Sequence, residues 1–374
     1  MLQKPFLICS FAFLVACCTT SVQSDKSATD SPSSVETTAS DGRPGEAVAA
    51  PGESSIEAIV NDEYQQLVMD MIDGAQSSIR VVHFECNDDW TIDKIVGRLV
   101  SAQKRGVDVQ VLLEAEVDDN ANRVEQFKGA GVNAKLDTDK KYTHAKLFVV
   151  DKREVLLGST NLSYKSILHN NETNLHIIDD EVGSYYFEYA NALWNAPDKV
   201  PQLEPVSVPE IGLVRTLHDG DYFGQAHPLI QEAKERILLL IYAIHLNPDY
   251  PDSDIHKLAT ALVEARKRGV EVRVILEVSD YNHTLNDMNQ VAADTLATGC
   301  VDVRFEPIEQ ISHAKLLIVD DTAVVGSNNW GYGGLYLYHE VGSVTVNADV
   351  LAKLTTYFEG IWGESSKASG NCRR

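Results

Sequence analysis

The pattern of hydrophobic and polar residues occurs twice along the chain. An amphipathic helical stretch over residues 99–105 ends at Gly106 and is followed by an apolar, β-branched run over 107–113; the same succession recurs over 262–276, with Gly269 at the matching place. Glycine is favoured just after a helix, and β-branched runs favour strands. Each copy therefore predicts a helix that turns at its glycine into a buried strand.

Further matching segments flank this pair. Upstream, residues 79–84 and 237–242 are apolar and strand-like, and downstream, residues 189–194 and 357–362 end helical patterns. Each copy thus reads β-α-β, followed by more strands and a helix. Such alternation predicts an α/β fold in which mixed sheets are flanked by helices on both faces. Two copies of this length predict a pair of α-β-α repeats related by a pseudo-twofold axis.

The first residues have the pattern of an export signal. Lys4 precedes an apolar run over residues 6–16, which is shorter than the roughly 20 residues that span a bilayer. The run ends in Leu-Val-Ala-Cys, which resembles a bacterial lipobox. This resemblance implies that residues 1–16 are a signal peptide and that Cys17 carries a lipid, while the alternative is an ordinary secretory signal. We expect a protein anchored to a membrane of the bacterial cell envelope (outer membrane or periplasm-facing in a Gram-negative cell).

Composition divides the remaining chain. Residues 17–55 are rich in Ser and Thr and predict a disordered tether. We expect the first repeat over 56–200, a proline-containing linker over 201–209, the second repeat over 210–364 and a tail over 365–374.

Charge and cysteine content exclude some functions. The chain carries a net charge of −23, and residues 56–374 carry −20. A generic polyanion-binding surface is therefore excluded, although a nuclease with a locally basic cleft is not. Six cysteines without a CxxC pair predict neither a disulfide scaffold nor a structural zinc site. Cys86, Cys300 and Cys372 are expected to be free thiols.

The polar residues that carry chemistry lie at the same place in each copy. Copy one has His-Ala-Lys, then four residues and Asp, then six residues and Gly-Ser-Thr-Asn; copy two has the same order, with five residues before Gly-Ser-Asn-Asn. A glutamate follows each final asparagine by eleven residues. Each motif predicts a hairpin in which the histidine and lysine share one strand face, and in which the glycine lets a ligand approach the backbone. The residues are His144, Lys146, Asp151, Ser159, Asn161 and Glu172, and His313, Lys315, Asp320, Ser327, Asn329 and Glu340.

This doubled pattern resembles the HxKxxxxDx6GSxN motif of the phospholipase D superfamily, with one residue fewer in the second turn. The resemblance covers residues 56–364 and implies one active site formed by both repeats, without metal or other cofactor. It implies a covalent phosphohistidine on His144, the amino-terminal histidine, with His313 as general acid. It also implies that Asp151 and Asp320 act mainly within their own hairpins.

The residue types suit phosphodiester chemistry. Histidine titrates near neutral pH, so one imidazole can attack while the other donates a proton. The lysines and asparagines can hold the phosphoryl oxygens, and the serines can donate further hydrogen bonds. Each glutamate can fix an imidazole tautomer, in its own or the opposite repeat.

The sequence specifies the substrate less closely than it specifies the reaction. A lipid anchor and an acidic domain favour phospholipid, cleaved by hydrolysis or by transfer. The alternatives are a nuclease of the same superfamily, with nucleic acid disfavoured as a partner, and a lipoprotein that binds phosphorylated ligands without turnover. The internal pair predicts a monomer. Two sets of residues allow two interpretations each. One set is aromatic and either packs in the core or lines the cleft: Trp330, Tyr332, Tyr336 and Tyr338. The other set consists of acids at strand ends, which either lie in solvated loops or surround the cleft: Asp88, Asp89, Asp118, Asp119 and Asp280.

Overall fold

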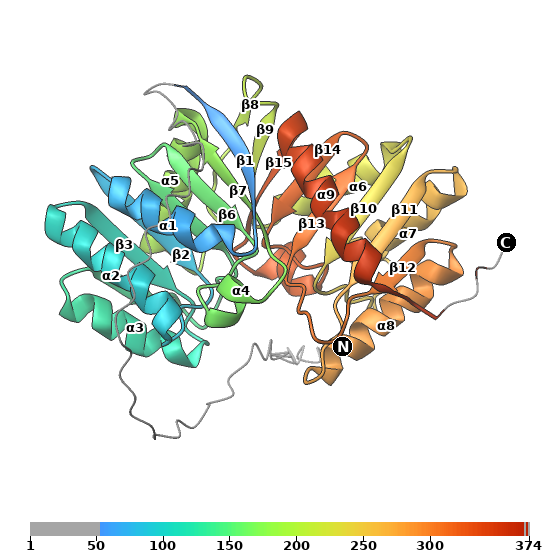
Figure 1. Cartoon of the computed structure of the whole chain (residues 1–374), viewed down its shortest axis with the longest axis horizontal. Helices are drawn as coiled ribbons and strands as arrows, with labels where there is room; N and C mark the ends of the chain where they lie inside the picture. Colours follow the sequence, from blue (N-terminus) through green and yellow to red (C-terminus); the bar gives the residue numbers. More distant parts are fainter. Residues whose placement is uncertain (1–52, 370–371, 373–374) are drawn as a thin grey trace, which may run out of the picture. The chain divides into compact units, whose positions relative to one another are not determined.

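The computed structural model describes residues 53–369 and 372 (Figure 1). The first repeat contains β1 (Ser55–Val60), α1 (Glu63–Gly74), β2 (Ser78–His83), α2 (Trp90–Arg105), β3 (Asp108–Leu113), α3 (Asp118–Gly129), β4 (Asn133–Leu136), β5 (Lys146–Val150), β6 (Glu154–Gly158), α4 (Tyr164–Leu168), β7 (Thr173–Ile178) and α5 (Asp180–Asn195). The second contains β8 (Ser207–Val208), β9 (Val214–His218), α6 (Asp221–Glu232), β10 (Arg236–Ile241), α7 (Asp254–Lys267), β11 (Glu271–Leu276), α8 (His283–Thr298), β12 (Asp302–Phe305), β13 (Lys315–Val319), β14 (Thr322–Gly326), the π-helical turn η1 (Gly333–Leu337), β15 (Val341–Thr345), α9 (Ala348–Glu364) and β16 (Ser366–Lys367).

The two sheets have the same strand order. The first runs β1-β7-β6-β5-β2-β3-β4, and the second runs β9, β15, β14, β13, β10, β11, β12 in the matching places, with β8 and β16 added at its edges. In both sheets the strand after each crossover helix pairs parallel, and the motif hairpin pairs antiparallel. The predicted α/β fold with two equivalent mixed sheets is confirmed.

The apolar residues form three cores. One lies between the first sheet and α1, α2 and α3, and a second lies between the second sheet and α6, α7 and α8. The third combines the remaining sheet faces of both repeats with α5 and α9, and it includes Leu147 of the first motif strand and Leu316 of the second. This shared core joins the two repeats and fixes the two motif hairpins relative to each other.

The last helix of each repeat also binds the opposite repeat. Tyr189 of α5 donates to Asp219 at 2.8 Å, just beyond β9. Tyr357 of α9 donates to Asn61, just beyond β1, at 2.7 Å. The last helices of the two repeats therefore make equivalent hydrogen bonds across the junction.

The motif aspartates differ from the expectation. The Asp151 carboxylate accepts backbone N–H groups of Gln76, Ser77 and Ser78 at 2.7–2.8 Å, and Asp320 accepts those of residues 234–236 at 2.8–3.0 Å. Their main partners thus lie outside their own hairpins, in the connections that lead into β2 and β10. Since both turns lie at the strand ends remote from the histidines, Asp151 and Asp320 anchor the hairpins and do not enter the site.

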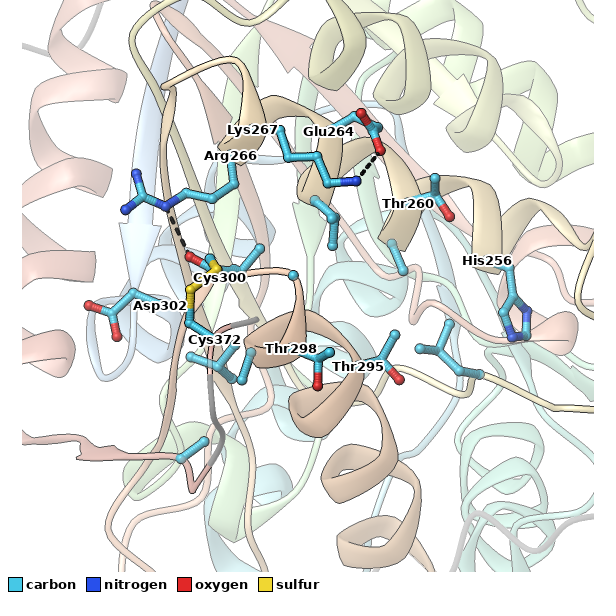
Figure 2. A pocket seen from close by; sticks show the side chains of 18 of the residues that line it. His256, Thr260, Glu264, Arg266, Lys267, Thr295, Thr298, Cys300, Asp302 and Cys372 are labelled. Atoms are coloured by element: carbon cyan, nitrogen blue, oxygen red, sulfur yellow. Dashed lines mark hydrogen bonds and ion pairs between the residues drawn. A yellow bond between two sulfur atoms is a disulfide. The ribbon is translucent and has the colours of Figure 1, made fainter. Parts of the chain in front are cut away.

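The expectation of three free thiols was wrong for two of them. Cys300 and Cys372 form a disulfide across 72 residues, and Cys86 is buried and free. Figure 2 shows the disulfide beside Arg266, whose side chain donates to the Cys300 carbonyl at 2.9 Å. It ties the end of the chain to the turn after α8, next to β16. A cavity of about 1070 Å³ between α7, α8 and this segment is lined by none of the motif residues.

Two sequence predictions concern the membrane. None of the described helices is long and apolar enough to cross a bilayer. The predicted signal peptide, Cys17 and nearly all of the tether lie outside the described residues.

Candidate active site

The two histidines meet where the repeats join. His144 and His313 lie two residues ahead of Lys146 and Lys315, the first residues of β5 and β13. The His144 N–H donates to the His339 carbonyl at 2.9 Å, and the His313 N–H donates to the Asn171 carbonyl at 2.9 Å. Each histidine backbone is thus held by the opposite repeat.

The glutamates serve the opposite histidines. His144 Nδ1 lies 3.0 and 3.1 Å from the two carboxylate oxygens of Glu340, and His313 Nδ1 lies 3.3 Å from Glu172 and 3.0 Å from the Ser159 carbonyl. All four side chains are at most 4% exposed. The question left open by the sequence is therefore resolved in favour of crossed dyads, and Nε2 is the ring nitrogen that each dyad leaves for chemistry.

The motif serines hold the carboxylates. Ser159 donates to Glu172 at 2.5 Å, and Ser327 donates to Glu340. A side chain at either motif glycine would collide with the neighbouring strand, because a Cβ at Gly158 would lie 2.4 Å from the Thr173 carbonyl oxygen. The glycines therefore permit close approach of β7 and β15, the strands that directly follow the two glutamates, whereas the sequence analysis expected the glycines to let a ligand approach.

The lysines bring the positive charge. Lys146 Nζ donates to the His144 carbonyl at 2.6 Å, and Lys315 makes the equivalent contact with His313. Both ammonium groups are buried, and both lower the pKa of each histidine. The Asn161 side-chain oxygen is buried without a hydrogen-bond partner in the described part of the chain, and so is that of Asn329. A phosphoryl oxygen would be held by the side-chain N–H groups of these asparagines, because their side-chain oxygens can only accept hydrogen bonds.

Burial and charge set the protonation states. Burial, then the charges of Lys146 and Lys315, lowers the pKa of His144 well below its usual value. Burial and Lys315 lower the pKa of His313 to about 4, against the opposing effect of Glu172. Burial raises the pKa of Glu340 to about 7. Burial also acts to raise the pKa of Glu172, but His313, Lys315 and the Ser159 hydrogen bond together outweigh it and lower that pKa. Both imidazoles are thus neutral near pH 7 before an anion enters.

Aromatic residues line the site where the sequence analysis did not place them. The Phe84 and His144 ring centroids are 5.2 Å apart, and those of Tyr242 and His313 are 5.0 Å apart. Both aromatic residues occupy the same position of the repeat, directly after β2 and β10. This match between the two copies is the sequence signal that could have identified them as site residues. Tyr338 lies 6.1 Å from His144, whereas Trp330 is buried in the core and donates to Tyr222, so the aromatics after the second motif divide between site and packing.

Two buried carboxyls support the histidine segments from behind. Glu114 accepts the Thr143 N–H, and Glu277 accepts the Ser312 N–H at 2.6 Å, each one residue before a motif histidine. Burial raises the pKa of Glu114 to about 8 and that of Glu277 to about 9. Glu114 directly follows β3 and Glu277 directly follows β11, so their matching places in the two copies were a signal that the sequence offered.

Family models and relatives agree with this geometry. The family described as cardiolipin synthase, PLD-like domain, matches residues 68–194 and 227–362, which is most of the chain. The protein belongs to this phospholipase D-like family. It is therefore a member of a superfamily of phosphodiesterases and phospholipid-modifying enzymes.

Named relatives cover parts of the chain. A phospholipase D of Rickettsia bellii is 27% identical over 124 residues, which is 33% of this chain and 60% of that protein. A human mitochondrial cardiolipin hydrolase is 32% identical over 101 residues, or 26% of this chain and 40% of that protein. The matched part thus spans less than two thirds of each of these relatives. The crystal structure of phosphatidylserine synthase from Haemophilus influenzae superposes with a TM-score of 0.68 at 14% identity, covering 84% of this chain and 87% of that one, which shows a shared fold.

Proposed function

We propose that the protein is a metal-independent phosphodiesterase that cleaves phospholipids through a phosphohistidine intermediate. The observation that carries this proposal is the pair of crossed His–Glu dyads, each with a buried lysine, at one junction of the two repeats. One imidazole can then face a phosphorus atom from each side, as in-line displacement requires.

The reaction has two steps. His144 Nε2 attacks phosphorus and forms a P–N bond, the bond to the leaving alkoxide breaks, and His313 gives the alkoxide a proton. His313 then removes a proton from water, whose oxygen displaces His144 and restores the enzyme. Lys146 and Lys315 neutralise the phosphoryl oxygens, which supplies the positive charge that a metal ion would otherwise bring. The substrate anion also raises the pKa of His313 toward the range in which it can act as an acid.

Phospholipid is the substrate that the chain's other features favour. The named relatives include phospholipases D and a cardiolipin hydrolase. The domain charge of −20 opposes nucleic acid. A lipid on Cys17, as the sequence pattern predicts, would hold the domain beside a membrane, and the Cys300–Cys372 disulfide fits an oxidising compartment such as the cell envelope.

A paired assay tests this function. Purified protein in excess EDTA is expected to release headgroup from phosphatidylcholine, to form the phosphatidyl alcohol when a primary alcohol is added, and to leave DNA intact. His144→Asn and His313→Asn should both nearly abolish turnover, while His256→Asn, half-buried in α7 beside the cavity that no motif residue lines, serves as the matched control. Nucleotide release from DNA with untouched phospholipid would instead establish a nuclease, and loss of activity in EDTA that a divalent ion restores would overturn the metal-free mechanism.

The anchor is tested separately. Cys17→Ser should release the protein from membranes or leave it unprocessed, as followed by fractionation and gel mobility. A variant that partitions and migrates like the parent would contradict lipidation at Cys17.

A further inference from the structure

Exposed large hydrophobic side chains gather on a few connections of the fold. Thirteen large hydrophobics are at least about a third exposed in the described part of the chain, and nine of them belong to connections at one edge of the two sheets. The other four, Val200, Leu213, Val291 and Val346, are aliphatic and lie elsewhere. We call the nine the aromatic rim: Trp90, Tyr164, Leu168, Tyr250, Tyr281, Ile308, Tyr332, Tyr336 and Leu337.

The rim surrounds the catalytic edge. In the first repeat Trp90 follows β2, and Tyr164 and Leu168 form part of α4 between β6 and β7 (Figure 1). In the second repeat the rim residues follow β10, β11, β12 and β14. These are the strand ends that also carry the histidines and motif serines, so the rim and the active site share one edge of both sheets.

Contacts across the repeats join the rim into one surface. The Trp90 and Tyr164 rings are 6.0 Å apart, and Lys165 of α4 lies 5.2 Å from the ring of Tyr281 in the opposite repeat. Gln310 donates to the His169 carbonyl, and Lys141 donates to the Leu337 carbonyl. On the far side, the Tyr332 and Tyr336 rings are 5.1 Å apart.

Ordinary surface composition does not account for this distribution. Scattered exposed hydrophobics are normal, but here all six exposed Trp and Tyr side chains of the described residues lie on the rim. Trp90, Tyr250 and Tyr332 are 57%, 67% and 61% exposed, so packing does not explain them. Amphipathic Trp and Tyr rings are the residues that settle at the headgroup level of a bilayer.

The charge of the same connections selects the kind of bilayer. Exposed carboxylates outnumber exposed lysines on these connections. The lysines are Lys94, Lys140 and Lys165, and the acids are Asp88, Glu116, Asp118, Asp139, Asp249, Asp252, Asp280 and Glu309. An anionic leaflet would repel this surface, whereas the ammonium groups of choline and ethanolamine headgroups complement it.

We propose that the aromatic rim docks the catalytic edge onto a bilayer of zwitterionic phospholipid, so that a substrate phosphate reaches the paired histidines from the membrane surface. The proposal rests on the phospholipid-cleaving function above. It assigns the rim a role separate from Cys17, which would tether the chain without orienting the domain.

Vesicle sedimentation tests the docking surface. The full-length chain with Cys17→Ser, made without lipidation, is mixed with vesicles of phosphatidylcholine and phosphatidylethanolamine. A triple variant, Trp90→Ser, Tyr250→Ser and Tyr332→Ser, is expected to lose about tenfold or more in partitioning, because three interfacial anchors are removed. Val291→Ser, 49% exposed on α8, is the matched control and should bind like the parent. Any binding by residues 1–16 is common to all variants and cancels in the comparison.

Further measurements complete the test. Replacing a third of the lipid with phosphatidylglycerol should weaken binding of the parent. Equal binding of parent and triple variant, or stronger binding to the anionic vesicles, would overturn the docking proposal. Turnover of a monomeric, water-soluble phosphodiester by the parent separates the two claims: turnover without rim-dependent vesicle binding removes the docking surface alone, and rim-dependent binding without turnover of any diester removes the proposed function and leaves the docking surface.

Discussion

The crossed dyads predict that the two buried glutamates control different chemical steps. Glu340 holds His144 at 3.0 Å, so Glu340→Gln removes the negative charge behind the proposed nucleophile. Glu172 holds His313 at 3.3 Å, so Glu172→Gln removes it behind the proposed acid. In both variants the amide oxygen can still accept the Nδ1 proton, and the fold keeps its contacts.

The magnitude follows from the kind of hydrogen bond lost. A hydrogen bond to a charged group contributes about 1.5–3 kcal/mol and a neutral one about 0.5–1.5 kcal/mol. A phosphorylated imidazole that keeps its Nδ1 proton is cationic, so it needs the carboxylate more than the free ring does. We expect a loss of about 2 kcal/mol in forming the intermediate, which is about 30-fold in rate.

Rapid mixing with an activated aryl phosphodiester separates the steps. Its leaving group needs no proton, so the burst of aryl alcohol reports attack by His144 alone. Glu340→Gln should slow the burst about 30-fold. Glu172→Gln should leave the burst rate close to that of the parent and slow steady turnover, because His313 must still take a proton from water. Glu57→Gln is the control, since Glu57 forms a 2.7 Å ion pair with His176 away from the motifs.

One combination of results refutes the reasoning. If phosphate maps to His144 by mass spectrometry while only Glu172→Gln slows the burst, then the dyads do not cross in the working enzyme. Phosphate on His313, with the two effects exchanged, would instead reverse the roles and keep the crossing.

Three further predictions concern the surroundings of the site. Burial raises the pKa of Glu340, and the charge of neighbouring Asp219 raises it further, so Asp219→Asn should lower the Glu340 pKa and move the acidic limb of the kcat/KM profile to lower pH. An unmoved limb would exclude Glu340 as the group that titrates there. Asp151→Ala should lower the free energy of unfolding in urea by about 1–3 kcal/mol near neutral pH, because three backbone N–H groups lose their acceptor. Since those hydrogen bonds outweigh burial and lower the pKa of Asp151, the stability difference between parent and variant should shrink as pH falls below about 4, and a difference that is constant with pH would show that the carboxylate charge plays no part. Cys372→Ser should lower the thermal midpoint without changing kcat, because the disulfide lies apart from the motifs, and a large fall in kcat in the folded variant would contradict that separation.

The sequence predicted the helices and strands within each repeat, but it did not predict the contacts between the two repeats. Strand and helix patterns over about six residues or more are local, so the strands at 79–84 and 237–242 appear within a residue of their predicted places. The pairing of Glu172 with His313 is not local. Because both copies carry the same residues at the same spacing, pairing within a repeat and pairing between repeats are indistinguishable until the shared core fixes the two hairpins relative to each other.

Two other failures have physical reasons. Cys300 and Cys372 are 72 residues apart, and only the fold brings the chain end beside the turn after α8. Asp151 was assigned to its own hairpin, but its carboxylate reaches into the connection before β2, which no periodicity reveals. Phe84 and Tyr242, in contrast, were within reach of the sequence, since equal positions in two copies should have been compared for aromatic as well as polar residues.

The pseudo-twofold axis is broken just behind the dyads. Asn61 accepts the Glu172 N–H at 3.0 Å and the Tyr357 hydroxyl at 2.7 Å; Asp219 accepts the Glu340 N–H at 3.1 Å and the Tyr189 hydroxyl at 2.8 Å. The backbone network is the same, but an amide has been replaced by a carboxylate.

The residue before each glutamate changes with it. Asn171 precedes Glu172, and its amide lies 3.5 Å from that of Asn61, whereas His339 precedes Glu340 and lies 3.0 Å from Asp219. The neutral pair in one repeat corresponds to a titratable pair in the other. The environments of the two catalytic dyads therefore differ in charge although they share one geometry.

This difference favours unequal roles for the two histidines. Glu172 remains ionised because His313, Lys315 and the Ser159 hydrogen bond together outweigh burial and lower its pKa. Its negative charge opposes the fall in the pKa of His313, which suits a proton donor once a substrate anion enters. Burial, with a contribution from Asp219, raises the pKa of Glu340 to about 7, so Glu340 favours a cationic His144 less strongly. A neutral imidazole is what a nucleophile needs. The replacement of Asn61 by Asp219 behind the second dyad thus agrees with the proposed roles of His144 as nucleophile and His313 as acid, within a fold whose backbone treats the two histidines alike.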